Sequence, residues 1–190
     1  MIPFLGVPLL LLPIHLVFLE IVVHPTSALV YENDPGGAED LMTQPPRGRA
    51  SGLLRPKDWL RPILLGIGLT IGCLAVYLLD LRTGYTAEVA RGMALATMLI
   101  GQMLLVLTER STRLPVWKQS LTDNPRLIPI LGGTVLMMLA MLYVPPLALA
   151  FRVAPPTLVH LTEAFAVAAI CTLWLEPFKR VWVDSSKKSA

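Results

Sequence analysis

The chain has 190 residues, of which 54% are hydrophobic and 15% charged, with a mean hydropathy of +0.63 and a formal charge of +3. This composition is too apolar and too poor in charge for an ordinary soluble domain. The basic residues gather between apolar blocks, so they indicate membrane topology and not a nucleic-acid partner. We therefore expect an integral membrane protein whose main surroundings are the lipid bilayer.

The apolar residues come in blocks of about 20, the length that a helix needs to cross roughly 30 Å of hydrocarbon. Spanning helices are expected, because membrane strands would alternate apolar and polar residues. The two cysteines, Cys73 and Cys171, fall inside the blocks and are interpreted as packing residues. We predict an all-α fold, a transmembrane helix bundle of about five spans, at about residues 10–31, 62–81, 89–107, 127–151 and 158–178.

Lysine and arginine are concentrated in the regions after the first and third predicted spans and in the C-terminal tail. Positively charged loops favour the cytoplasmic side, so the chain is predicted to start outside and to end in the cytoplasm. The longest polar region, residues 32–61, contains ENDPGG and QPPRGR, which are rich in turn-forming residues. We interpret it as a cytoplasmic loop that is too small to be a catalytic domain.

The first predicted span contains an acid, Glu20, and a histidine, His24, with Pro25 directly after them. A spacing of four residues places both side chains on one face of a helix, and charged groups inside a membrane normally have a partner or a function. Pro25 is expected to break the helix and to free the carbonyls of residues 20–22 as cation ligands. The alternative is a helix kinked by proline, in which Glu20 and His24 pair with neighbours for packing.

Gln102 lies in the middle of the third span, where its amide can bridge helices or offer an oxygen to an ion. It is the third candidate ligand of the cation site, after Glu20 and His24. Other polar residues lie nearer the predicted outer ends of the spans, where they can reach the interface without a specific role. These are His15, His160 and Glu163.

The run LLPIHLVFLEIVVHPTSALVYENDPGGAEDLMTQPPRGR resembles the sixth transmembrane segment and the following loop of cation-transporting P-type ATPases of the calcium-pump type. The four later blocks are similar to the last four helices of that family in number, loop lengths and sidedness. The resemblance therefore implies the C-terminal membrane domain of such a pump, in a prokaryotic plasma membrane, with residues 32–61 as its cytoplasmic coupling loop. The matching positions are Leu12, Pro13, His15, Phe18, Glu20, His24, Met42, Pro45, Pro46 and Arg47.

The resemblance also implies which residues face the transported ion. In calcium pumps the position that matches Glu20 is an asparagine and the one that matches His24 is an aspartate, and both are cation ligands. Gln102 matches a glutamate or glutamine of the eighth segment. Because histidine replaces a hard anionic oxygen, a proton or a transition cation becomes as plausible a cargo as calcium.

The chain has no Asp-Lys-Thr-Gly-Thr phosphorylation motif, no Gly-Asp-Gly-x-Asn-Asp motif and no Thr-Gly-Glu motif. It cannot hydrolyse ATP by itself, so we expect it to bind no cofactor and to be a fragment, half of a split gene or a remnant of a transport domain. The parent pump would use ATP and magnesium. The expected partner is the upstream half of that pump, with the fourth and fifth segments and the phosphorylation domain.

Two other functions remain open from the sequence. The first is a non-enzymatic helical membrane module that binds or regulates another membrane protein. The second is a small secondary transporter driven by protonation of Glu20 and His24, which five spans disfavour because no inverted repeat is present.

Overall fold

The computed structural model describes residues 7–34, 56–111 and 114–179, and every regular element within them is helical. This confirms the predicted all-α fold. Most of the predicted coupling loop, residues 32–61, lies outside the described residues. The helices are α1 (Pro13–Glu32), α2 (Pro56–Arg82), α3 (Ala87–Glu109), η2 (Val116–Lys118), α4 (Leu127–Tyr143), α5 (Pro145–Phe151), α6 (Leu158–Leu173) and η3 (Glu176–Phe178).

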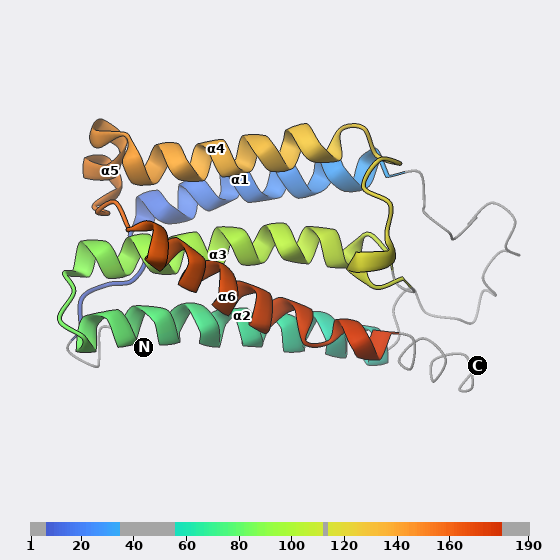
Figure 1. Cartoon of the computed structure of the whole chain (residues 1–190), viewed down its shortest axis with the longest axis horizontal. Helices are drawn as coiled ribbons and strands as arrows, with labels where there is room; N and C mark the ends of the chain where they lie inside the picture. Colours follow the sequence, from blue (N-terminus) through green and yellow to red (C-terminus); the bar gives the residue numbers. More distant parts are fainter. Residues whose placement is uncertain (1–6, 35–55, 112–113, 180–190) are drawn as a thin grey trace, which may run out of the picture.

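The long helices run roughly parallel to the long axis of the molecule, and helices that follow each other in the chain run in opposite directions (Figure 1). α1 and α4 lie side by side, α2 and α6 lie on the other side of the molecule, and α3 contacts all four. The carboxyl ends of α1, α3 and α6 therefore meet the amino ends of α2 and α4. We call this end of the bundle the loop end; α5 lies at the opposite end.

Four helical segments are long and apolar enough to cross a membrane, and a fifth span results if α4 and α5 are counted together. The last membrane-length segment is Leu158–Phe178, and the second helix begins earlier than the predicted span 62–81. α2 begins at Pro56 and not at residue 62, so that Pro62 lies inside the helix. The last helix, α6, ends at Leu173, and the short helix η3 continues the chain to Phe178.

The predicted break near Pro25 is not present, because α1 continues as one helix from Pro13 to Glu32. Proline removes one backbone hydrogen bond from the turn before it, and hydroxyl side chains can satisfy carbonyls there. The hydroxyl of Thr26 donates to the Val22 carbonyl, and the hydroxyl of Ser27 donates to the Val23 carbonyl at 2.9 Å. The two residues after Pro25 thus supply donors to the preceding turn, and the helix continues although neither hydroxyl reaches the Ile21 carbonyl, which loses its donor at Pro25.

A sharp bend occurs instead in the predicted span 127–151, where α4 and α5 meet at an angle of 82°. Val144, between them, has the extended backbone that a residue before proline prefers, with φ −82° and ψ 115°. Pro145 and Pro146 follow and open α5, where their missing N–H groups would have had no helical partner. Two successive prolines thus end a helix that the single Pro25 does not.

The glycines of α2 allow α6 to approach closely. A methyl group added at Gly72 would lie 2.6 Å from the Cys171 sulfur and 3.2 Å from a Val167 methyl carbon. We predict that Gly72→Ala destabilises the bundle by about 1–3 kcal/mol, the usual cost of overpacking a core. The measurement is the midpoint of thermal unfolding of the chain in a mild detergent.

Gly66 on the same helix is the matched control, because a methyl group there would meet nothing within 4 Å. Gly66→Ala is expected to leave the midpoint unchanged or to raise it slightly, since alanine is the better helix former. Equal midpoints for the two variants would show that α2 and α6 are not in close contact at Gly72.

Candidate cation site

Glu20 and His24 are in direct contact on α1. His24 Nδ1 and Glu20 Oε2 form a hydrogen-bonded pair, as the spacing of four residues predicts. The two residues lie on either side of the middle of α1, which runs from Pro13 to Glu32. A carboxylate oxygen and an imidazole nitrogen in direct contact can share a proton, and the same two groups can act as cation ligands when they separate.

This pair lies on the outer face of the bundle. The side chains of Glu20 and His24 are 68% and 70% exposed, although they lie within an apolar helix. Around them the same face of α1 is apolar, with Leu16, Val17 and Ile21 also exposed. A paired acid and histidine facing lipid would be costly, so a further protein surface is needed to cover this face in a membrane.

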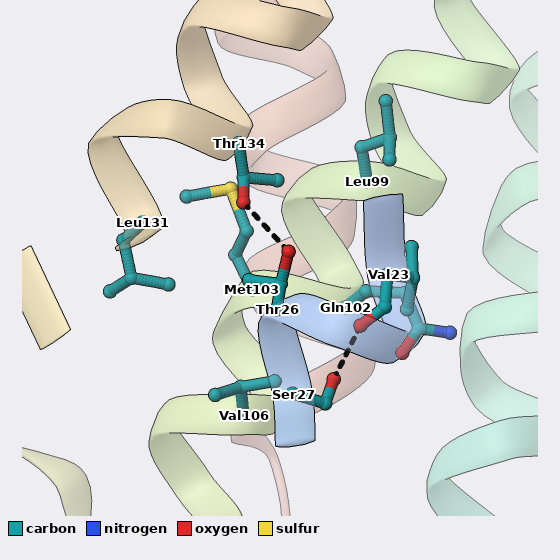
Figure 2. A pocket seen from close by; sticks show the side chains of 9 residues that line it. All are labelled: Val23, Thr26, Ser27, Leu99, Gln102, Met103, Val106, Leu131 and Thr134. Carbon is teal, nitrogen blue, oxygen red and sulfur yellow. Dashed lines mark hydrogen bonds between the residues drawn. The ribbon is translucent and has the colours of Figure 1, made fainter. Parts of the chain in front are cut away.

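Gln102 of α3 lies on the inner side of α1, where it lines a small cavity together with Thr26, Ser27 and Thr134 (Figure 2). The cavity measures about 10 Å³, roughly the space that one water molecule requires. The Thr26 and Thr134 hydroxyl oxygens are 3.4 Å apart across it. These hydroxyls were not predicted as site residues, although Thr26 and Ser27 directly follow Pro25 in the sequence.

Gln102 also lines a second, larger space on the other side of α3. This groove of about 390 Å³ lies between α2, α3 and the segment before α1, and its other lining residues are mostly apolar, such as Leu69 and Met98. In Figure 2 the amide of Gln102 is turned away from the Thr26–Thr134 pair. Among the described residues its side chain has no hydrogen-bond partner. An amide inside a membrane domain is thus left free to bind another group.

The structure therefore brings Glu20 and His24 together but does not place Gln102 beside them. Within residues 7–34, 56–111 and 114–179, no group of three or more histidine, cysteine or acidic side chains could hold a metal ion. The three predicted ligands do not make a complete cation site in this chain. Whether they share one site in an assembled pump stays a prediction.

His15 is fully buried and does not reach an interface as the sequence suggested. Its Nδ1 accepts the Leu12 N–H at 3.1 Å, and its Nε2 is 2.6 Å from the Phe151 carbonyl oxygen. These partners require a neutral ring that carries its proton on Nε2. The ring also stacks on Phe151 at 5.9 Å. His15 thus joins the start of α1, one turn before Glu20, to the end of α5.

Charged residues at the loop end form a buried cluster. Arg61 of α2 has its Nη2 atom 3.1 Å from Glu109 of α3 and 3.1 Å from Glu176 of η3. The second oxygen of Glu176 accepts the backbone N–H of Val116 at 2.8 Å. The Glu176 side chain is 1% exposed. The cluster therefore joins α2, α3, η2 and η3.

Lys179 completes this cluster, and its side chain is also 1% exposed. Its Nζ donates to the Thr108 carbonyl at 2.5 Å and to Glu176 at 3.1 Å. Burial lowers the pKa of Lys179 below its ordinary value, and the neighbouring Arg61 charge acts in the same direction. The hydrogen bond and charge of Glu176, and the charge of Glu109, oppose this shift. Two bases and two acids thus balance in charge.

Residues 8–181 match the family model described as the C-terminus of cation-transporting ATPases. This chain belongs to that family. A comparison with curated proteins finds no match. With its four or five helices of spanning length, this cation-transporting ATPase C-terminus is an integral membrane protein.

The family explains why polar groups remain without partners in this C-terminal domain. The family is the C-terminal domain of cation-transporting ATPases, which implies a larger ATPase around such a domain. The exposed Glu20–His24 pair and the free amide of Gln102 are polar groups that further helices could cover. The acids and bases of the loop-end cluster, in contrast, pair with one another within the chain, although Arg61 Nε has no hydrogen-bond partner there.

Proposed function

We propose that this C-terminal domain supplies part of the intramembrane cation site of a P-type ATPase, with Glu20 and His24 as ligands and Gln102 as a third. The observation that carries the proposal is the contact of Glu20 with His24 at the middle of a membrane-length helix, on a face that the chain leaves open. The fourth and fifth segments of the upstream half would cover this face and complete the ligand set. ATP and magnesium would act in the phosphorylation domain.

The sidedness follows from the charges at the two ends of the bundle. The loop end contains Arg61, Arg110, Arg126 and Lys179, whereas fewer basic residues lie at the end with α5. Under the positive-inside rule, the loop end lies in the cytoplasm of a prokaryotic cell and the start of α1 lies outside. The connection between α1 and α2 would then face the phosphorylation domain, as a coupling loop requires.

The ion preference is expected to depend on His24. Its imidazole favours a proton or a transition cation, whereas an aspartate would add a hard oxygen that calcium prefers. We predict that His24→Asp shifts the preference of the complete pump toward calcium by about tenfold, comparable to one ligand interaction of about 1.4 kcal/mol. The experiment is cation-stimulated phosphorylation of the pump, with this chain joined to its upstream half, scanning protons, calcium, manganese and zinc.

His160→Asp is the matched control, because His160 lies at the start of α6, far along the bundle from the middle of α1 (Figure 1). It should leave the ion preference as in the wild type. An identical preference in wild type and His24→Asp would rule out His24 as the residue that selects the ion. No stimulation by any cation would favour the non-enzymatic membrane module, which the open apolar face of α1 would also suit.

A further inference from the structure

Two neighbouring residues at the end of α3 contact the two ends of the connection between α1 and α2. Arg110 Nε donates to Asp34 Oδ2 at 2.6 Å, and Asp34 lies just after α1. Glu109 Oε1 is 3.1 Å from Nη2 of Arg61, which lies in the first turns of α2. One short stretch of α3 therefore contacts the chain where it leaves α1 and where it enters α2.

The contact at Asp34 is enclosed. The Arg110 and Asp34 side chains are 5% and 10% exposed, so their attraction is screened less than that of a surface pair. Arg110 also donates to the Ser120 carbonyl at 3.2 Å, which holds the guanidinium in place. A second bond supports the same end of α1, since Arg126 donates to the side-chain oxygen of Asn33 at 2.6 Å.

The contact at Arg61 is held from two sides. Arg61 is 12% exposed and lies between Glu109, which is 34% exposed, and the buried Glu176. The charges of the two contacts are opposite, because α3 offers a base to the end of α1 and an acid to the start of α2. Arg110 therefore pairs with the acid after α1, and Glu109 pairs with the base near the start of α2.

α3 also carries Gln102, two turns before Glu109 on the same helix. More than half of the apolar part of α3 is buried among the other helices, and a closely packed helix transmits a displacement along its length. We propose that Glu109 and Arg110 are positioning residues that hold both ends of the α1–α2 connection to α3, so that a displacement of α3 at Gln102 moves both ends together. This proposal rests on the proposed function, in which occupancy of the cation site must reach the phosphorylation domain.

The test uses the complete pump and exchanges the charges of the more enclosed contact. Asp34→Arg and Arg110→Asp should each lower the maximal rate of cation-stimulated phosphorylation by about fivefold or more, as the loss of a coupled interaction would. The cation concentration for half-maximal stimulation should stay within about twofold, because no proposed ligand is changed. The double variant, Asp34→Arg with Arg110→Asp, should recover at least half of the lost rate.

Lys118→Glu is the control, since Lys118 is an exposed base at the same end of the bundle. It should leave the rate unchanged. The proposal is overturned if the single variants keep the wild-type rate, if the double variant is no faster than the single ones, or if the main change is in the half-maximal concentration.

A second measurement separates this proposal from the proposed function. The thermal unfolding midpoint of the complete chain in detergent should fall in each single variant and recover in the double variant, independent of any pump activity. A wild type without cation-stimulated phosphorylation, together with this recovery, would refute the coupling role and the pump but retain the contact. Midpoint losses that simply add in the double variant would refute the contact itself.

Discussion

Glu20→Gln in the complete pump is expected to raise the cation concentration for half-maximal phosphorylation by about tenfold or more, as the loss of one carboxylate ligand would. Glutamine keeps the size and one oxygen of the side chain but carries no charge. His24 also loses the acidic partner that contacts its Nδ1 atom. The measurement is a cation titration of phosphoenzyme formation at fixed pH.

Glu163→Gln is the matched control, because Glu163 is an exposed acid of α6 and is not a proposed ligand. It should titrate as the wild type does. If Glu20→Gln shows an unchanged half-maximal concentration, Glu20 serves only to pair with His24 on the outer face of α1. An equal shift in both variants would indicate a general effect of negative charge and no specific ligand.

Glu176→Gln is expected to have the largest effect on stability. The acid accepts the Val116 N–H and contacts both Lys179 and Arg61, so its neutral replacement leaves two largely buried bases facing Glu109 alone. Removing one partner of a buried ion pair costs about 3–5 kcal/mol. The measurement is equilibrium unfolding of the chain in mixed detergent micelles, with the exposed Glu163→Gln as the control.

A second substitution distinguishes charge imbalance from lost packing. Lys179→Met in the Glu176→Gln background removes one base as well, and leaves Arg61 with Glu109. Because Lys179→Met removes the buried charge that Glu176→Gln leaves unpaired, this double variant should recover part of the lost stability. A double variant as unstable as Glu176→Gln alone would show that the hydrogen bonds of Glu176 matter more than the charge balance.

The all-α fold could be predicted from the sequence, because helices are the simplest way to satisfy the backbone in long apolar blocks. The position of the bend could not be predicted from proline alone. Pro25 was expected to break a span, yet Thr26 and Ser27 supply hydroxyl donors to the turn before it. The sequence contains both Pro25 and the two hydroxyl residues after it. Pro145 and Pro146, in contrast, are followed by apolar residues without hydroxyl groups.

The contact of Glu20 with His24 could be predicted, since it depends only on the spacing along one helix. Their exposure could not, because the helices that cover a face are not specified by the sequence of that face. The same limit explains why the buried cluster at the loop end was missed. Arg61 and Glu176 are 115 positions apart, and nothing in the sequence pattern indicates that their side chains meet.

The most direct test of the central claim is equilibrium binding of calcium, manganese and zinc, each measured separately, to the complete pump. Wild type is compared with the variant that carries Glu20→Ala and His24→Ala. If these residues are cation ligands, the wild type binds at least one of the three ions, or it binds and releases protons that the double variant does not. The double variant should then bind the ion about a hundredfold more weakly, because the two ligand losses add. Equal binding and equal proton release in both proteins would contradict the assignment of Glu20 and His24 to the cation site.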